Sequence, residues 1–381
     1  EVGRLISTQR GRRLVKSQLE EVGSYAVYQN SMKPLGYYHE SNTQAGACFV
    51  IVAGAAGEIG FSDAAFWAAD DVYFFPESKS VNSKYLYHFL LTKQHDISSQ
   101  VRRASIPRLS IAVVEKLEIP IPCPDNPKKS LEIQAEIVRI LDSFTELTAE
   151  LTAELTARKK QYNYYRDKLL SFEDGEVEWK MLGEVAKIQR GASPRPIAKY
   201  ITDDEDGVPW IKIGDTSPGS KYVNRTAQKI TLEGAEKSRV LNIGDFIMSN
   251  SMSFGRPYIL GIRGAIHDGW ASISDFGEVL NSDYLYHYLS SNTVQNYWAG
   301  KINSGSVSNL NADIIKALPV PIPDLVIQDR IASILDKFDT LTNSITEGLP
   351  REIELRQKQY AYYRDLLFNF PKPETASAAS A

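Results

Sequence analysis

The sequence predicts an α+β protein that contains two copies of one unit, each a β-rich domain followed by a long α-helix. Two observations predict this fold class. Several stretches of the first half return in the second half in the same order, and each half ends in a segment with helical periodicity and few helix breakers. A chain of 381 residues is long enough for two or three domains with cores of their own.

The internal duplication is visible in four pairs of segments. VNSKYLYHFL at 81–90 returns as LNSDYLYHYL at 280–289, a shift of 199 residues (280 minus 81). The stretches LEIPIP, IQAEIVRILDSFTELT and RKKQYNYYRDKLLSF return as LPVPIP, IQDRIASILDKFDTLT and RQKQYAYYRDLLFNF. Four matches in one order indicate a repeat of about 190 residues.

Each copy is predicted to contain a β-rich domain and a helix. Runs such as FVIVAGAAG and VPWIKIGD, bounded by turn residues, are typical of strands and place the β-rich domains at 1–125 and 176–323. The helices are expected over 130–172 and 326–370. The tail 371–381 has few apolar residues and is expected to be disordered.

The first helix is predicted from a stretch between Ser130 and Ser171 that has neither Gly nor Pro, with Ser130 as the N-cap. Its apolar residues recur every three or four positions and form one stripe: Leu131, Ile137, Leu141, Phe144, Leu147, Leu151 and Leu155. In the second helix, EGLP at 347–350 should cause a kink or a break. Two long striped helices are expected to pack antiparallel as a coiled coil.

A four-residue word is repeated inside the first helix, in TELTAELTAELTA at 145–157. Nine residues, 149–157, separate TELT from RKKQ, whereas thirteen, 343–355, separate DTLT from RQKQ, a difference of four (13 minus 9). Four residues add about 6 Å of helix. The segment is therefore predicted to be a spacer whose length is adjustable.

The composition indicates a folded protein without a membrane span. Net charge is −4, and no run of about 18 apolar residues occurs. The chain opens with EVGRLISTQRGRR, which has neither an initiator Met nor the apolar core of a signal peptide, so we expect a cytoplasmic protein whose sequence begins ahead of Glu1. Cys48 and Cys123 lie in unlike contexts and predict neither a disulfide nor a metal site.

Short basic and polar stretches in both β-rich domains predict contact with nucleic acid, because phosphate binding requires local positive charge. The candidates in the first domain are Arg10, Arg12, Arg13, Lys16, Gln29, Asn30, Ser31, Lys33, Arg103, Ser105 and Arg108. Those in the second domain are Arg190, Ser193, Arg195, Lys199, Asn250, Ser253, Arg256, Ser306 and Asn309. Basic stretches are also common on ordinary solvated loops, which is the alternative interpretation.

The two copies share apolar positions and differ at polar ones. ASIPRLSIAVVEKLEIPIP (104–122) aligns without a gap with GSVSNLNADIIKALPVPIP (305–323), which places Arg108 opposite Asn309. Arg suits guanine and Asn suits adenine in the major groove, so one scaffold with unlike tips is predicted to read two unlike sequences. GEIG at 57–60 is aligned with SFGR at 253–256 as a hairpin expected close to the duplex.

With these features the whole chain resembles the DNA specificity subunit of a type I restriction-modification enzyme. The resemblance rests on the duplication, the runs VYQNSMKPLGYYHE, VIVAGAAGEIG, VPWIKIGD and IGDFIMSNSMSFGRPYIL, the helix ends YYRDKLL and YYRDLLF, and the TAEL words. It implies two target recognition domains, each reading half of a split asymmetric site in double-stranded DNA, held apart by two antiparallel helices. The first copy departs from the family in lacking an opening element like GEVEWKMLGEV, of which only EV remains.

The resemblance also implies partners and a division of labour. Two modification (methyltransferase) subunits would dock on the helices, and motor-nuclease restriction subunits would join them. The chain itself would be non-catalytic and bind no cofactor, with S-adenosylmethionine, ATP and Mg on the partner subunits. Neither an Asn-Pro-Pro-aromatic nor an Asp-Pro-Pro-aromatic motif occurs, which agrees with methylation being done elsewhere.

Several other features have competing interpretations. VAGAAGEIG lacks the Lys-Ser/Thr of a phosphate-binding loop and is expected to be a β-turn. Asp70, Asp71, Glu77 and Lys79 loosely suggest a metal-dependent nuclease, but the second copy lacks this group. His88 and His287 are expected to be packing residues with satisfied ring nitrogens.

The helix ends carry the residues predicted to bind partners: Tyr162, Tyr165, Arg166, Tyr360, Tyr363 and Arg364. The alternative is that these aromatic residues close the base of the coiled coil. At the level of the whole chain, the alternative function is a coiled-coil scaffold that joins protein-binding domains without reading DNA. Salt distinguishes the two, because only DNA binding weakens steeply as salt rises.

Overall fold

The computed structural model describes residues 1–173, 175–217, 219–250, 255–303, 310–344 and 346–371. These residues form two compact units. Unit 1 consists of Glu1–Ala149 and Leu355–Ala381, and unit 2 of Glu150–Glu354. Each unit therefore takes its β-rich domain from one repeat and part of its helical layer from the other. Within the described residues, no helix is long and apolar enough to cross a membrane.

Unit 1 begins with short elements and ends its first segment in a long helix. Its elements are α1 (Val2–Leu5), β1 (Gln9–Arg10), η1 (Lys16–Gln18), β2 (Tyr25–Tyr28), β3 (Gly36–Tyr38), β4 (Ala47–Ile51), β5 (Ile59–Ser62), β6 (Trp67–Ala68), β7 (Val72–Phe75), α2 (Ser83–Thr92), α3 (Gln94–Ser99), α4 (Ala112–Glu115) and the first half of α5 (Pro127–Leu169). The main sheet has the antiparallel order β1-β7-β4-β5, and a smaller sheet has the order β3-β2-β6.

Strand β4 forms the centre of unit 1 because every one of its residues, ACFVI, is buried. A strand that is apolar on both faces needs cover on both. One face packs against α2, through residues such as Tyr85 and Phe89. The other face carries Phe49, whose ring centroid lies 5.0 Å from that of Phe66. VAGAAGEIG is the turn of the β4–β5 hairpin, as predicted.

Unit 2 has a larger second sheet than unit 1. Its elements are β8 (Glu178–Met181), α6 (Leu182–Val185), β9 (Lys187–Arg190), η2 (Ile197–Lys199), β10 (Ile201–Thr202), β11 (Val208–Ile211), η3 (Ile213–Asp215), β12 (Tyr222–Val223), β13 (Gln228–Ile230), α7 (Leu232–Glu236), β14 (Arg239–Leu241), β15 (Phe246–Ser249), β16 (Pro257–Leu260), β17 (Gly264–Ile266), β18 (Trp270–Ser274), α8 (Ser282–Leu289), α9 (Asn292–Asn303), α10 (Ala312–Lys316), β19 (Pro319–Ile322), α11 (Leu325–Asn343) and the start of α12 (Gly348–Leu367).

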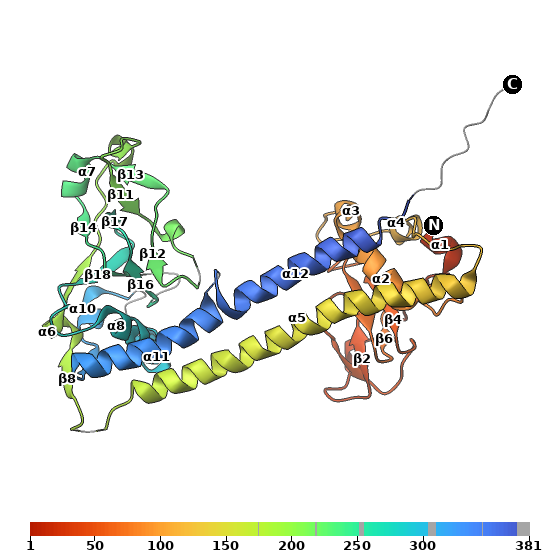
Figure 1. The fold of residues 1–381 in the computed structure, drawn as a ribbon, viewed down its shortest axis with the longest axis horizontal. Helices are drawn as coiled ribbons and strands as arrows, with labels where there is room; N and C mark the ends of the chain where they lie inside the picture. The colour runs from red at the N-terminus through yellow and green to blue at the C-terminus, as the bar shows by residue number, and fades with distance from the viewer. Residues whose placement is uncertain (174, 218, 251–254, 304–309, 345, 372–381) are drawn as a thin grey trace. The chain divides into compact units, whose positions relative to one another are not determined.

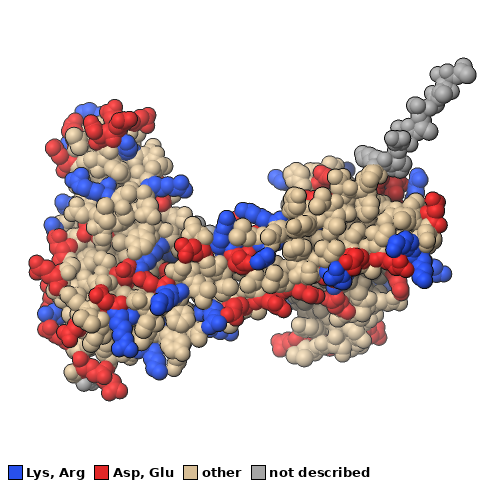
Figure 2. All heavy atoms as spheres, viewed as in Figure 1, with Lys and Arg blue, Asp and Glu red and all other residues tan. Residues whose placement is uncertain are grey.

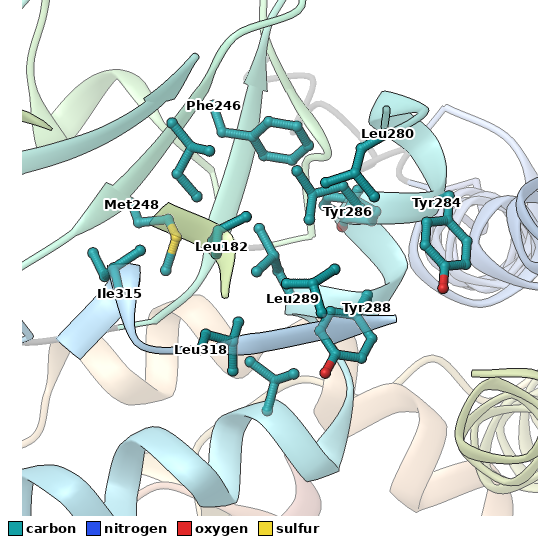
Figure 3. Close-up of a cluster of buried hydrophobic side chains, with 14 of the residues drawn as sticks. Leu182, Phe246, Met248, Leu280, Tyr284, Tyr286, Tyr288, Leu289, Ile315 and Leu318 are labelled. Carbon is teal, nitrogen blue, oxygen red and sulfur yellow. The ribbon is translucent and has the colours of Figure 1, made fainter. Parts of the chain in front are cut away.

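The main sheet of unit 2, the shared sheet, has the order β12-β16-β15-β18-β9, in which the last four strands correspond to β5, β4, β7 and β1. The second sheet has the order β10-β13-β11-β17-β14, in which β13, β11 and β17 repeat the pairing of β3, β2 and β6. Strand β19 pairs with β8. Side chains from β15, α6, α8 and α10 converge in one buried cluster that joins the shared sheet to the helices (Figure 3). The predicted fold class, α+β with an internal duplication and a pair of long helices, is confirmed.

Helix α5 is 43 residues long. It begins at Pro127, where a proline is favoured because the first helical N–H needs no partner. The side chain of Asn126 accepts a hydrogen bond from the N–H of Lys129 at 3.0 Å. The predicted N-cap is therefore wrong: Ser130 lies one turn inside the helix, is buried, and accepts a hydrogen bond from Gln134.

Within each unit, the helices run side by side in opposite directions (Figure 1). In unit 1 the second half of α12 lies along α5, and the rings of Phe144 and Tyr363 stack at 5.4 Å. In unit 2 Phe338 of α11 stacks on Tyr165 of α5 at 5.7 Å. The second long helix is interrupted, because α11 ends at Asn343 and α12 begins at Gly348. The interruption ends at Gly348, whose φ of 74° lies in the left-handed region that favours glycine.

Candidate DNA interface

In unit 1, three of the predicted loops meet backbone to backbone. The N–H of Ala55 donates to the carbonyl of Asn30 at 2.9 Å, and the N–H of Gly54 donates to the carbonyl of Pro107 at 3.1 Å. A side chain at position 54 would collide with the backbone of Asn30. The β4–β5 turn and the loop that contains Asn30 therefore approach as closely as glycine allows. The exposed side chains of Asn30 and Arg108 therefore belong to one loop cluster.

A fourth segment, the basic stretch after β1, is attached to the same cluster. The guanidinium Nε of Arg10 donates to the carbonyl of Asp70 at 2.9 Å, and the indole N–H of Trp67 donates to the carbonyl of Arg12 at 3.0 Å. The turn between β6 and β7 is tied in turn to β2, because the N–H of Ala69 donates to the carbonyl of Tyr28 at 2.9 Å. The side chains of Arg12 and Arg13 are exposed beside it.

Unit 2 repeats several of these contacts, and together the repeated contacts form a common frame. The Nε of Arg190 donates to the carbonyl of Asp268 at 3.0 Å, as Arg10 does to Asp70. A side chain at Gly191 would collide with the carbonyl of His267, and one at Gly11 would collide with the carbonyl of Ala69. These glycines allow the strand after Arg10 or Arg190 to pass directly under the turn.

Leu109, ahead of α4 in unit 1, and Leu310, ahead of α10 in unit 2, are anchored in the same way. The N–H of Asn250 donates to the carbonyl of Gly269 at 3.0 Å, and the N–H of Leu310 donates to the carbonyl of Asn250 at 3.1 Å. The corresponding bonds of unit 1 join Val52 to Asp71 at 2.8 Å and Leu109 to Val52 at 2.9 Å. Asn250 is thus placed in the cluster by its backbone.

The frame corrects the predicted alignment of the two hairpins. Gly57 has a φ of 91° and its carbonyl accepts a hydrogen bond from Gln94 at 2.9 Å. Gly255 has a φ of 82° and its carbonyl accepts from Gln295 at 2.9 Å. Gly57 therefore corresponds to Gly255, whereas the sequence alignment placed it opposite Ser253, two residues away.

The side chains on the shared frame differ between the units. In unit 2, Ser193, Arg195 and His267 gather around the carboxylate of Asp268. The hydrogen bond from Ser193 lowers the pKa of the Asp268 carboxyl, with a smaller contribution from His267, so the group is an anion at neutral pH. At the positions of Ser193, Arg195 and His267, unit 1 has Arg13, Val15 and Ala69.

The remaining candidates differ in their place. The ammonium group of Lys199 lies over the ring of Tyr200, next to the second sheet, and the guanidinium of Arg256 lies over the ring of Tyr258. Lys16 is exposed in η1. The other candidates of unit 1 are exposed or half-exposed in the same loops as Asn30 and Arg108: Gln29, Ser31, Lys33, Arg103 and Ser105. Ser253, Ser306 and Asn309 lie outside the residues that the structure describes. On the face drawn in Figure 2, basic and acidic side chains are interspersed, so positive charge is local.

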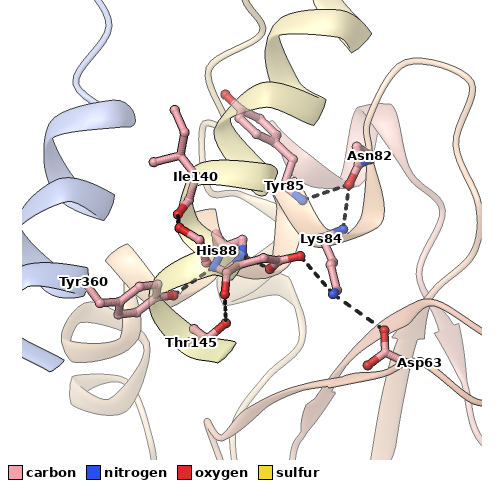
Figure 4. Close-up of polar contacts among 10 residues, drawn as sticks. Asp63, Asn82, Lys84, Tyr85, His88, Ile140, Thr145 and Tyr360 are labelled. Atoms are coloured by element: carbon pink, nitrogen blue, oxygen red, sulfur yellow. Dashed lines mark hydrogen bonds and ion pairs between the residues drawn. The ribbon is translucent and has the colours of Figure 1, made fainter. Parts of the chain in front are cut away.

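The two repeated histidines form matching buried networks. In unit 1 His88 Nε2 donates to Asp142 at 3.0 Å, and His88 Nδ1 accepts from the hydroxyl of Tyr360 at 2.8 Å (Figure 4). In unit 2 His287 Nε2 donates to Asp336 at 2.8 Å, and His287 Nδ1 accepts from Tyr162 at 3.0 Å. Both ring nitrogens are satisfied, as predicted for packing residues.

These networks change the interpretation of the predicted partner residues. Tyr162 and Arg166 are 4% and 7% exposed, so the expectation that they face a partner is corrected: they pack inside unit 2. Tyr360 is half-buried against His88, and Arg364 is half-buried beside it, with its guanidinium 5.5 Å from the Tyr360 ring.

The neighbouring tyrosines remain exposed and are repeated. Tyr164 and Tyr165 are 61% and 38% exposed, and Tyr362 and Tyr363 are 64% and 41% exposed. Each pair is T-shaped, with ring centroids 5.3 Å apart. Both units thus present the same aromatic pair at the same place on their helices.

Among the described residues, no group of His, Cys, Asp and Glu could hold a metal ion, the Asp70–Asp71 turn included. What the geometry offers is a frame of backbone hydrogen bonds built twice, with different exposed side chains on each copy. It defines the class of protein as one in which two units, each with its own paired long helices, present related loop frames with different side chains.

Comparison with known proteins agrees with this class. Residues 1–158 and 175–355 match the family described as Type I restriction modification DNA specificity domain. The chain is 45% identical over 300 residues to the Type I restriction enzyme EcoR124I/EcoR124II specificity subunit of Escherichia coli, covering 77% of this chain and 72% of that protein. It is 36% identical over 382 residues to the putative type I restriction enzyme specificity subunit S.HindORF215P of Haemophilus influenzae, covering 94% and 91%.

Among solved structures, the fold is similar to that of a type I restriction-modification system S subunit from M. genitalium, with a TM-score of 0.60, 17% identity, and coverage of 98% of this chain and 95% of that one. The chain belongs to the family of type I restriction-modification DNA specificity subunits.

Sequence reasoning missed His267 and Asp268 as members of the candidate interface. The available signal was weak, because an Asp stands at the corresponding position of both repeats, in AADDVYF and AIHDGWA. A surface that binds phosphate is expected to carry basic residues, so an acidic residue there is not predicted.

Proposed function

We propose that the chain recognises a two-part asymmetric site in double-stranded DNA, and that the loop cluster of each unit reads one part. The observation that carries the proposal is the frame around Asp70 and Asp268, in which several hydrogen bonds recur in both units while the exposed side chains differ. A common frame sets each loop at the same height above a groove, and different side chains then select different bases. The family to which the chain belongs supports DNA as the ligand.

The unread gap between the two parts is set by the helices in this proposal. Helix α5 contributes its first half to unit 1 and its second half to unit 2 without interruption. Each residue of a continuous helix adds about 1.5 Å to its length. The number of base pairs between the half sites therefore follows the number of residues in α5.

The chain acts as a non-catalytic scaffold for partner subunits in this proposal. The repeated pairs Tyr164–Tyr165 and Tyr362–Tyr363 offer two equal docking sites, which suits two copies of one modification subunit. Motor-nuclease restriction subunits complete the assembly. S-adenosylmethionine, ATP and Mg belong to these partners, and the complex acts on DNA in the cytoplasm.

The test is genome-wide methylation mapping in cells that carry this chain with its modification subunit. The expected result is one bipartite motif with a constant gap, absent when the chain is omitted. Binding of the reconstituted complex to that motif should weaken steeply between about 50 and 200 mM salt, because phosphate contacts release counterions. A continuous motif, or binding that salt leaves unchanged, would favour the alternative of a coiled-coil protein scaffold without DNA readout.

A further inference from the structure

We propose that Asp268 is a specificity-determining residue of unit 2, which accepts a hydrogen bond from the exocyclic amino group of a cytosine or an adenine in the major groove. The inference rests on the proposed function and adds to it the chemical kind of base read at one position. It is carried by the arrangement of Ser193, His267 and Arg195 around the carboxylate.

The carboxylate is held by one of its two oxygens. His267 Nδ1 accepts from the N–H of Gly269 at 2.8 Å, so the proton is on Nε2, which lies 3.1 Å from Asp268 Oδ1. The hydroxyl of Ser193 accepts from the N–H of Asp268 at 3.2 Å and donates to the same Oδ1 at 2.8 Å. The Ser193 hydroxyl thus fixes Oδ1, and the His267 ring lies against the same oxygen.

The other oxygen, Oδ2, is left for a ligand. No described residue donates a hydrogen bond to it, and Arg195 Nη2 lies 3.7 Å away on a side chain that is 85% exposed. The Asp268 side chain is 32% exposed. An oriented carboxylate oxygen with an unused lone pair can accept a hydrogen bond from an N–H donor of a ligand.

Comparison with unit 1 shows that Ser193, His267 and Arg195 are not needed to build the turn. The turn at Asp70 keeps the hydrogen bond from the Arg10 guanidinium at 2.9 Å with none of these three side chains present. In unit 2, Ser193 and His267 accept from backbone N–H groups of the turn, and all three side chains also surround the Asp268 carboxylate.

The charge of the surroundings indicates which part of DNA the carboxylate meets. Arg190 and Arg195 flank Asp268 and suit contact with DNA phosphates. The Asp268 carboxylate is an anion, so phosphates repel it. In the major groove, the donors that a carboxylate matches are N4 of cytosine and N6 of adenine. Asp268 is thus suited to a base edge, with the arginines on the backbone beside it.

The test is Asp268→Asn, assayed by methylation mapping and by selection of bound sequences from randomised DNA with the full complex. The amide keeps an oxygen for Ser193 and His267 and replaces Oδ2 with an N–H donor. At one position of one half site, we expect the preference for an amino-bearing base to fall by on the order of 10-fold or more, in favour of a base that offers an acceptor. The other half site and the gap should not change.

Asp203→Asn is the matched control, because it removes the same charge from an exposed loop of unit 2 and should change no position. Ser193→Ala is the second variant, since it loosens Oδ1 without altering the charge and should weaken selection at the same position only. Loss spread evenly over the half site with either variant, or unchanged selection with both, would overturn the proposal. A wild-type complex that shows no bipartite motif would instead overturn the proposed function.

Discussion

At the scale of single residues, the buried His–Asp–Tyr networks show how the repeats depend on each other. In unit 1, His88 and Asp142 come from the first repeat, but Tyr360 comes from the second. In unit 2 the origin is reversed, with Tyr162 from the first repeat and His287 from the second. Burial raises the pKa of both tyrosines, so each hydroxyl keeps its proton and donates to the histidine.

His88 should make stability depend on pH. Burial lowers the pKa of its ring, Asp142 opposes this, and the nearby charges of Lys84 and Arg364 lower the pKa further. The unfolded chain then binds a proton near pH 6.5 that the folded chain does not, so stability falls as pH drops below 6.5 and is unaffected by this group above it. The slope is up to about 1.4 kcal/mol per pH unit.

The measurement is the denaturant midpoint of the whole chain at several pH values between 5.5 and 7.5, for wild type and for His88→Gln. The variant should be less stable at pH 7.5 and should show a shallower decline. Equal slopes would mean that the ring does not titrate as the structure implies.

Gly191 should tolerate no side chain. Alanine there would collide with the carbonyl of His267, and only a shift of the backbone relieves this. We expect Gly191→Ala to destabilise the protein by about 2–4 kcal/mol and to impair one half site. Gly214→Ala is the control, because a methyl group at position 214 has nothing within 4 Å. Thermal unfolding that is equal for the two variants would contradict the close approach.

At the scale of elements, a half-buried lysine lies on a helix in unit 1 and directly before a strand in unit 2. In unit 1 Lys84, on α2, bonds Asp142 at 3.0 Å. In unit 2 the same helical position is Asp283, and Lys221, next to β12, lies 2.6 Å from both Asp283 and Asp336. Burial tends to lower the pKa of Lys221, but its bonds to the two carboxylates outweigh this and raise it. Strand β12 thereby ties the sheet to α8 and α11.

This exchange predicts a rescue. Lys221→Met should destabilise unit 2 by about 3–5 kcal/mol, because it leaves two carboxylates in a half-buried site without a cation. Adding Asp283→Lys recreates the arrangement of unit 1 and should restore at least half of that loss. Chemical unfolding of the single and double variants measures it, and a double variant no better than the single one would show that the two arrangements are not equivalent.

At the scale of the whole chain, the long helix explains why neither repeat forms a compact unit alone. Helix α5 begins as the continuation of the first β-rich domain and ends in the core of unit 2, where Tyr162 and Leu170 are buried. Unit 1 is completed by Tyr360, Leu367 and Phe368 of the second repeat. The boundaries of the compact units therefore fall inside the long helices and do not coincide with the ends of the repeats.

Removing one word of the spacer tests how the helix is used. Deleting Thr152–Leu155 shortens α5 by about 6 Å, against about 3.4 Å per base pair, so the gap in the DNA motif should shrink by one or two base pairs. Both half sites should keep their bases, because their loop clusters are untouched. Methylation mapping measures both the gap and the half sites. Altered half sites with an unchanged gap would contradict the proposal that the length of α5 sets the gap.

The sequence by itself determined the duplication, the β-rich and helical segments, the break before Gly348, and the packing role of the two histidines. These follow from repetition, periodicity and breaker residues, which act locally. It placed Arg10, Asn30, Arg108, Arg190, Ser193 and Arg195 on candidate loops without showing which loops meet. It also made the wrong choice for Tyr162 and Arg166, because the face of a helix that becomes buried depends on what packs against it.

Only the tertiary structure decided that Gly57 is the counterpart of Gly255 and that each compact unit contains segments of both repeats. It also decided that Ser193, Arg195 and His267 lie around Asp268. Each of these brings together residues that are distant in the chain. Local preferences carry no information on such contacts, since they form only when sheet register and helix packing set the loops against one another.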